Sequence, residues 1–166
     1  MNYTIAAIET RYNGVNFRSR LEAKWAAFFD LCGFRWEYEP IDFRGWIPDF
    51  FLEVPCGHSE CNPTHTLYAE VKPYRSLDEF KGHPAYGVEW GCLTFANPDS
   101  PDGFDEVSLG VDAVALLGLS PASGVSQVQS MSHGAGGGHF DIEFFCRGDV
   151  DCLWREAGNV TRWNRR

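Results

Sequence analysis

The chain of 166 residues has the length of a single domain, and its 44% apolar and 15% aromatic residues predict a folded protein with a substantial core. A net charge of -9 argues against a protein that coats nucleic acid by charge alone. It does not exclude an enzyme that acts on nucleic acid, because a metal-dependent nuclease needs clustered carboxylates. No apolar run is long enough to span a bilayer, and residues 1–14 do not resemble a signal peptide. We therefore expect a cytoplasmic protein with no membrane association and mostly reduced cysteines.

The first half of the chain predicts a helix followed by three strands. Residues 18–32 place apolar side chains at helical spacing, and Gly33 is a natural end for that helix. Alternation of apolar and polar residues then predicts strands at residues 34–39, 46–54 and 66–72. The second and third of these strands are joined by a loop rich in Cys, His, Gly and Pro.

The second half predicts less regular structure. Residues 120–138 are rich in Ser and Gly and low in large apolar side chains, which predicts a flexible loop at about these positions. The remaining predicted elements are a short helix at 75–81, strands at 90–95, 111–117 and 140–146, and a C-terminal helix at 150–163, weakened at Gly158. This order indicates one mixed α/β domain over residues 1–166.

Two carboxylates and a lysine stand out on adjacent predicted strands. Because side chains alternate along a strand, Glu70 and Lys72 share one face while Leu67, Ala69 and Val71 share the other. Asp49 lies in the preceding apolar strand, where an unpaired carboxylate is costly to bury. A divalent cation bound between the two carboxylates, with the lysine nearby, would offset the cost of burying their charges.

The residue types suit hydrolysis of a phosphodiester. Asp49 and Glu70 supply anionic oxygen ligands, and the carbonyl of Val71 adds a neutral one, as Mg²⁺ or Mn²⁺ prefers. A bound metal ion lowers the pKa of a water molecule and screens the developing charge. Lys72 is placed to hydrogen-bond the attacking water or the scissile phosphate, and it would need a depressed pKa to act as a general base.

Pro48-Asp49 followed by Glu70-Val71-Lys72 on the next strand, after a helix that bears Glu22, resembles the PD-(D/E)xK nuclease superfamily. The stretch FRSRLEAKWAAFFDLCGFRWEYEP, with WIPDF and YAEVKP after it, is similar to small phage and bacterial nucleases of that superfamily. The resemblance covers roughly residues 17–95. It implies a restriction-endonuclease-like core of a helix, a three-stranded sheet, a helix and a strand, here with a C-terminal extension.

The resemblance also assigns roles to individual residues. It implies that Asp49 and Glu70 bind Mg²⁺, that Lys72 assists the water, and that Glu22 orients a ligand water or binds a second metal ion. Glu22 has a competing structural explanation, because Ser19 and Glu22 match a capping box in which Glu22 hydrogen-bonds the Ser19 amide. Arg18 and Arg20 are candidate phosphate contacts, and solvated charges at a helix end explain them equally well.

The loop between the second and third strands contains a second candidate metal site. Cys56, Cys61 and His65 carry donors that bind Zn²⁺ in structural sites, although their spacing is looser than that of a Cys-x-x-Cys knuckle. Cys146 and Cys152 form another possible pair of ligands. The alternative is a loop with free cysteines and solvated histidines.

The sequence therefore predicts a Mg²⁺-dependent endonuclease that acts on DNA. A branched-DNA resolvase, a nicking enzyme and a defence nuclease are equally compatible, and a resolvase would be expected to form a homodimer. The alternative is a non-catalytic acidic protein on the same fold that mimics DNA or binds a protein partner. The acidic residues between Asp99 and Asp112 favour that alternative, and the complete set of Asp49, Glu70 and Lys72 argues against it.

Overall fold

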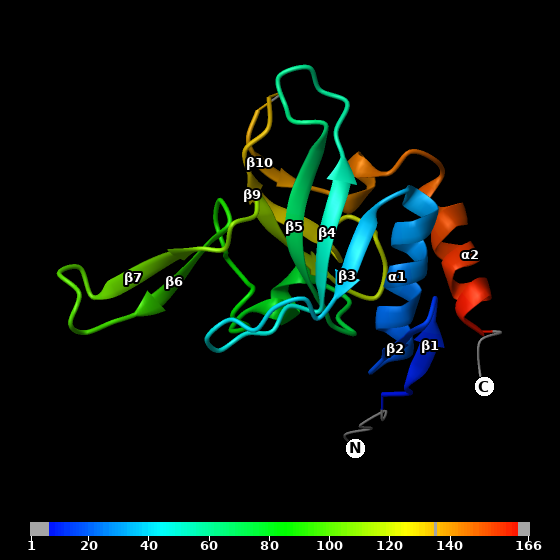
Figure 1. Ribbon diagram of the computed structural model, residues 1–166, viewed down its shortest axis with the longest axis horizontal. Coiled ribbons are helices and arrows are strands. Elements are labelled where there is room, and N and C mark those ends of the chain that lie inside the picture. The colour runs from blue at the N-terminus through cyan, green and yellow to red at the C-terminus, as the bar shows by residue number, and fades with distance from the viewer. Residues whose placement is uncertain (1–6, 135, 163–166) are drawn as a thin grey trace.

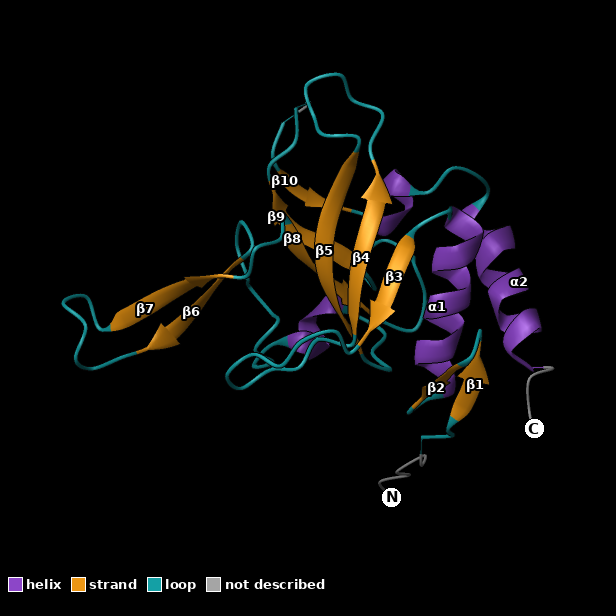
Figure 2. Ribbon diagram, in the orientation of Figure 1, coloured by secondary structure: helices purple, strands orange, loops and turns teal. Residues whose placement is uncertain are grey.

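The computed structural model describes residues 7–134 and 136–162 (Figure 1). They form a mixed α/β structure in which most elements are strands and two are helices (Figure 2). The strands are β1 (Thr10–Tyr12), β2 (Val15–Phe17), β3 (Arg35–Tyr38), β4 (Phe50–Pro55), β5 (Thr64–Val71), β6 (Cys92–Ala96), β7 (Phe104–Ser108), β8 (Ala113–Leu117), β9 (Gln127–Met131) and β10 (Gly138–Phe140). The helices are α1 (Arg20–Cys32) and α2 (Val150–Arg162), and short 3₁₀ helices occur at η1 (Leu77–Phe80) and η2 (Ile142–Phe145).

A six-stranded sheet in the order β10-β9-β8-β5-β4-β3 forms the centre of the molecule. Strands β3, β4 and β5, which correspond to the three strands predicted from the sequence, are antiparallel neighbours, whereas β5 and β8 run parallel. A parallel pair requires a long crossover, and here the crossover contains η1 and the β6–β7 hairpin. This hairpin projects away from the sheet on the side opposite the helices (Figure 1).

The two faces of the sheet are covered by different parts of the chain. On one face, Leu67, Ala69 and Val71 of β5 pack in a core that includes residues of α1 and α2. On the other face, Tyr68 packs with Trp46 and Phe80, which lie in the loop before β4 and in η1. The alternation predicted for β5 is therefore present, and it leaves Glu70 on the face that the two α-helices do not cover.

Helix α1 begins and ends as its sequence predicts. The Ser19 hydroxyl accepts a hydrogen bond from the Glu22 amide at 3.1 Å, which satisfies an N–H that the first turn leaves unpaired. Gly33 adopts a left-handed conformation with φ 74°, and its N–H bonds to the carbonyl of Asp30 at 3.1 Å. A residue with a Cβ is strained in that conformation, so glycine suits this position.

The expectation of a loop across residues 120–138 is wrong in part, because β9 (Gln127–Met131) lies in this range and is largely buried. The low apolar content is compensated by hydrogen bonds. The Gln129 side-chain amide donates to the Ala85 carbonyl at 2.7 Å, and its oxygen accepts from the Gly87 amide at 2.7 Å. A buried polar side chain whose partners are all supplied is compatible with a central strand.

The predicted strand at residues 140–146 is also wrong. Only its first residue belongs to β10, and η2 follows. Ile142 and Phe145 are buried while Phe144 is 55% exposed, so the apolar residues face the core at a spacing of three rather than two. That spacing is typical of a 3₁₀ helix. The short helix predicted at 75–81 is likewise a single 3₁₀ turn, η1.

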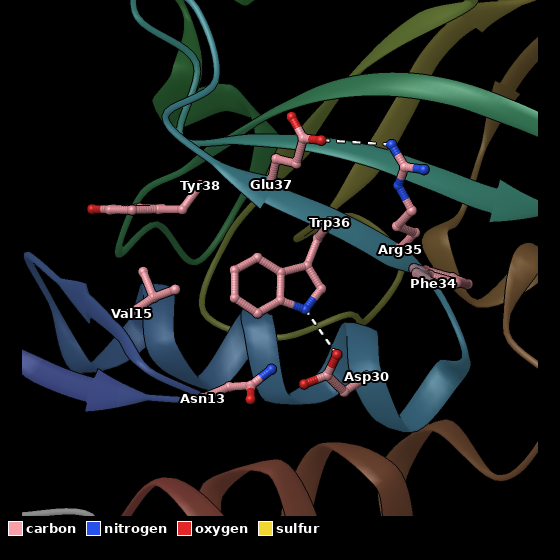
Figure 3. Close-up of a pocket in the computed structure, with 8 residues that line it drawn as sticks. All are labelled: Asn13, Val15, Asp30, Phe34, Arg35, Trp36, Glu37 and Tyr38. Carbon is pink, nitrogen blue, oxygen red and sulfur yellow. Dashed lines mark hydrogen bonds and ion pairs between the residues drawn. The ribbon is translucent and has the colours of Figure 1, made fainter.

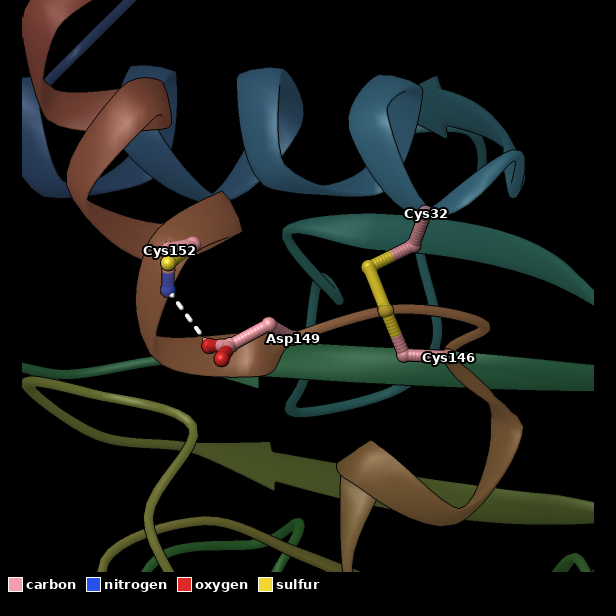
Figure 4. Close-up of a disulfide and its surroundings, with 4 residues drawn as sticks. All are labelled: Cys32, Cys146, Asp149 and Cys152. Carbon is pink, nitrogen blue, oxygen red and sulfur yellow. Dashed lines mark hydrogen bonds between the residues drawn. A yellow bond between two sulfur atoms is a disulfide. The ribbon is translucent and has the colours of Figure 1, made fainter.

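A disulfide joins Cys32, at the end of α1, to Cys146, just before α2 (Figure 4). Because Cys146 forms this disulfide, it is not available as a metal ligand together with Cys152, as the sequence suggests. Helix α2 begins next to the disulfide, where the Asp149 carboxylate accepts a hydrogen bond from the Cys152 amide at 2.9 Å. The helix then continues without a break through Gly158. Neither α-helix of the described residues combines the length and the apolar character needed to cross a membrane.

Candidate functional site

Asp49 and Glu70 meet where β4 begins and β5 ends. Phe50 pairs with Ala69, so the antiparallel register places Asp49 opposite Glu70 on the neighbouring strand. Both side chains are almost completely buried, at 2% and 3% exposure. The second carboxyl oxygen of Asp49 accepts a hydrogen bond from the Val71 amide at 2.8 Å, which ties the two strand ends together. The sheet thus brings together the two carboxylates that the sequence predicts as metal ligands.

The environment of Asp49 opposes a negative charge. Burial raises the pKa of Asp49 to about 7, and the charge of Glu70 adds to this effect, although the Val71 N–H and Lys72 act in the opposite direction. The first carboxyl oxygen of Asp49 is 3.0 Å from the Arg18 guanidinium. This pairing does not prevent the rise in pKa. Burial is thus the main reason that the charged form of Asp49 is disfavoured, and the nearby Glu70 carboxylate contributes less.

Three side chains hold the Glu70 carboxylate from different elements. The Trp46 indole N–H donates to its second oxygen at 2.7 Å, and Lys72 donates to its first oxygen. The His83 Nε2 lies 3.2 Å from that first oxygen. Burial lowers the pKa of His83 more than the charge of Glu70 raises it, which favours the neutral imidazole.

Lys72 adopts the position that the strand alternation predicts. Burial by itself lowers the pKa of Lys72. The hydrogen bond and charge of Glu70, together with the charge of Asp49, raise this pKa by more than burial lowers it, so the net shift is upward. Its ammonium also lies 3.3 Å from the Val71 carbonyl oxygen. In this state Lys72 is a charged hydrogen-bond donor, and the depressed pKa that a general base would need is absent.

Glu22 faces the site rather than closing a reciprocal capping box. The Tyr38 hydroxyl donates a hydrogen bond to its second carboxyl oxygen at 2.5 Å. Burial raises the pKa of Tyr38 to about 12, and the bond to Glu22 reinforces the rise, so the hydroxyl keeps its proton. The charge of Glu22 in turn contributes to the raised pKa of Asp49. Glu22 is therefore electrostatically part of the carboxylate cluster.

Arg18 and Arg20 differ in what they contact. The Arg18 guanidinium lies 2.7 Å from Glu39 and 3.0 Å from Asp49, although 63% of the side chain is exposed. Arg18 is thus a partner of the buried carboxylate that also reaches solvent. Arg20 is the first residue of α1, and its side chain takes no part in the hydrogen bonds that hold Asp49.

A pocket of about 590 Å³ lies beside this cluster, between β3 and the β1–β2 hairpin (Figure 3). Trp36 lines it and donates its indole N–H to the Asp30 carboxylate at 2.9 Å. Tyr38 lines one end of the pocket, and the same residue bonds to Glu22. Tyr38 is therefore shared by the pocket and the carboxylate cluster, whereas Glu22, Asp49 and Glu70 do not line the pocket.

The structure brings Asp49, Glu70 and Lys72 together at adjoining strand ends and adds contacts from irregular segments. Trp46 and His83 both contact Glu70, and the sequence predicts neither contact. Trp46 stands three positions before Asp49, within the range predicted as one strand, but β4 begins only at Phe50. The preceding segment is a turn with a Phe43–Trp46 bridge that turns the indole toward Glu70. No spacing in the sequence links His83 to the site.

A separate group of thiols and imidazoles lies toward the other end of β5. The ligand atoms of Cys56, Cys61, His65 and His133 all lie within 4.8 Å of one another, so this group could hold a metal ion. The first three are predicted by the sequence, whereas His133 comes from the β9–β10 loop. Within the described residues, the three carboxylates of Glu22, Asp49 and Glu70 do not form a group as compact as this one.

In comparisons with known proteins, no family model matches the chain, and no curated protein or solved structure matches it either.

Proposed function

We propose that this chain is a metal-dependent nuclease that hydrolyses DNA phosphodiester bonds at Asp49, Glu70 and Lys72. The observation that carries the proposal is the pairing of two buried carboxylates at adjoining strand ends, with a lysine ammonium on one of them. The resemblance to PD-(D/E)xK nucleases agrees with this placement and suggests that the helix, the three antiparallel strands and β8 correspond to a restriction-endonuclease-like core. The second helix of that core would be reduced here to η1.

The donor set suits Mg²⁺ or Mn²⁺. Carboxylate oxygens of Asp49 and Glu70 and the Val71 carbonyl are hard oxygen donors, and the two carboxylates lie on adjoining strand ends. When bound there, the metal ion would acidify a water molecule and screen charge on the phosphate. The Cys and His group takes no part in this chemistry, because soft donors do not suit magnesium.

The remaining residues position the reactants. Lys72, charged and beside Glu70, donates a hydrogen bond to the attacking water or to a non-bridging phosphate oxygen. The water gives up a proton to solvent as its oxygen bonds to phosphorus, the bond to the leaving oxygen breaks, and the leaving oxygen takes up a proton from solvent. Trp46 and His83 fix the orientation of Glu70. The partly exposed Arg18 guanidinium pairs with Asp49, and with five N–H donors it can also contact a DNA phosphate. Arg20, at the start of α1, is a second candidate phosphate contact.

The experiment that tests this proposal is a cleavage assay on linear, nicked, single-stranded and branched DNA with Mg²⁺ or Mn²⁺. We expect the wild-type protein to cut at least one substrate, and Asp49→Ala, Glu70→Ala and Lys72→Ala each to reduce the rate by about 100-fold or more. Circular dichroism checks that each variant is folded. Asp105→Ala is the matched control, because it removes a carboxylate from the exposed strand β7 and should leave cleavage unchanged.

Two outcomes would contradict the proposal. If the three variants cut like the wild-type protein, the catalytic residues are assigned wrongly. If the wild-type protein cuts none of the four substrates with either metal, the chain is not a nuclease, and an acidic binding protein becomes the better explanation of its charge.

A further inference from the structure

The group of Cys56, Cys61, His65 and His133 has the composition and spacing of a closed metal site. Two thiols and two imidazoles favour a tetrahedral ion, and protein bonds to zinc of about 2.0–2.3 Å place neighbouring ligand atoms roughly 3.3–3.8 Å apart. The Cys56 Sγ and the His133 Nε2 are 3.2 Å apart, and the whole group lies within 4.8 Å. Small side-chain movements would therefore complete the tetrahedron.

His65 provides an independent reason to place an ion here. Its Nε2 is buried and, among the described residues, has no hydrogen-bond partner. Its Nδ1 lies 3.2 Å from the Asp112 carboxylate, which is itself fixed by the Thr66 amide at 3.0 Å. A proton shared with Asp112 on Nδ1 leaves a lone pair on Nε2. This is the arrangement of a metal-binding histidine whose other ring nitrogen is held by a carboxylate.

The backbone around the group is also adapted to close approach. The Gly134 amide donates to the Cys61 Sγ at 3.1 Å, which stabilises negative charge on that sulfur. A Cβ at Gly134 would lie 2.4 Å from the His58 Nδ1, so glycine lets the β9–β10 loop pass close to the β4–β5 loop without displacing His58. The two loops meet here although β8 separates β5 from β9 in the sheet.

We propose that these four residues bind a structural Zn²⁺ ion, with Cys56 and Cys61 as thiolates and His65 and His133 as neutral imidazoles. Four protein ligands leave no open position for water, so the ion has no catalytic role. It fastens the β4–β5 loop to the β9–β10 loop. Five residue steps along β5 separate His65 from Glu70, a distance of about 17 Å, so the zinc is remote from the proposed catalytic centre.

The test is the metal content of the full chain, purified without chelators and measured by inductively coupled plasma mass spectrometry. We expect one zinc per chain in the wild-type protein, and loss of that zinc in Cys56→Ser and His133→Ala. His58→Asn is the matched control, because His58 lies beside His133 with ring centroids 5.2 Å apart but is outside the ligand set. It should retain zinc.

Cobalt substitution keeps the proposal testable if a ligand variant fails to fold. Wild-type protein reconstituted with Co²⁺ should show the intense visible absorption of a tetrahedral site with thiolate ligands. Absence of zinc from the wild-type protein even after incubation with Zn²⁺ would overturn the proposal, and so would full zinc content in His133→Ala. Asp49→Asn should keep its zinc, so failure of the nuclease proposal would leave this result unaffected.

Discussion

The Glu70 carboxylate is oriented by three residues that come from three different segments. Lys72 comes from the end of the same strand, Trp46 from the turn before β4, and His83 from the segment after η1. A ligand carboxylate that is held on both oxygens loses little freedom when a cation binds, and residues of this kind tune metal affinity without touching the metal. Trp46 is thus a positioning residue in the proposed site.

Trp46→Phe tests this role. Phenylalanine keeps the aromatic packing with Phe43 and Tyr68 but cannot donate the hydrogen bond to Glu70. We expect the Mg²⁺ concentration for half-maximal cleavage to rise about 10- to 100-fold, while the rate at saturating Mg²⁺ changes much less. A magnesium titration of the cleavage rate measures both quantities. Trp36→Phe, which removes a hydrogen bond to Asp30 in the pocket, is the control. If Trp46→Phe needs the same Mg²⁺ concentration as the wild-type protein for half-maximal cleavage, the indole N–H does not position Glu70 and Trp46 contributes packing alone.

At this scale, strand alternation is sufficient to predict that Glu70 and Lys72 share a face, because it depends only on local geometry. The place of Asp49 opposite Glu70 depends in addition on the pairing of two consecutive strands. The contacts of Trp46 and His83 depend on how two irregular segments fold back over the sheet, and no periodicity encodes that path. His133 is missed for the same reason, since 68 positions separate it from His65 in the sequence.

Among the elements, α2 shows how packing overrides a local weakness. Glycine disfavours a helix interior, and the sequence therefore predicts a helix weakened at Gly158. In the structure the helix is continuous, because Trp154 packs on Trp25 with ring centroids 4.7 Å apart and Ala157 is fully buried. The Lys24 ammonium lies 4.0 Å from the centre of a Trp154 ring and adds a cation–π contact.

Gly158→Ala should therefore stabilise the protein. A Cβ there would lie 3.2 Å from the Lys24 side chain, which is flexible enough to move, and the gain in helix propensity is about 0.5–1 kcal/mol.

Gly118→Ala should have the opposite effect on stability, because its Cβ would lie 2.6 Å from the carbonyl oxygens of Tyr74 and Val125. We expect a loss of about 1–3 kcal/mol there. Urea unfolding measures both changes in the free energy of unfolding. Destabilisation by Gly158→Ala would mean that the Lys24 side chain cannot move away from the added methyl group.

The prediction of elements fails where burial does not follow apolar content. Strand β9 is polar in sequence yet buried, because loop backbone groups satisfy Gln129. Strands β1 and β2 are only three residues long each, too short for an alternation to stand out. The elements α1, β3 and β5 are predicted to within a few residues, since each has a clear apolar period.

Across the whole molecule, the Cys32–Cys146 disulfide is the longest covalent constraint. It links positions 114 residues apart, with Cα atoms 5.2 Å from each other. Cys32 ends α1 and lies in the apolar core, and no local pattern in the sequence indicates its partner. Cross-links that close long loops reduce the entropy of the unfolded chain more than short ones do.

Cys146→Ser should lower the free energy of unfolding by about 2–4 kcal/mol. Cys152→Ser is the control, because Cys152 is an exposed free cysteine and its loss should change stability little. Chemical denaturation of both variants, compared with the oxidised wild-type protein, measures the difference. Equal stability of Cys146→Ser and the wild-type protein would show that the unfolded chain is already restricted in this region.

The alternating faces of β5 also bear on how the chain avoids misfolding. The connection between β4 and β5 spans residues 56–63, too long to fix the strand register as a tight turn would. A hairpin slipped by one residue would turn Leu67, Ala69 and Val71 out of the helix-covered core. The same slip would remove His65 from the thiol group and separate Glu70 from Asp49. A single register error thus loses the core packing, the Cys and His group and the Asp49–Glu70 pair together. A hairpin paired in the wrong register is therefore weakly stabilised and can rearrange to the correct one.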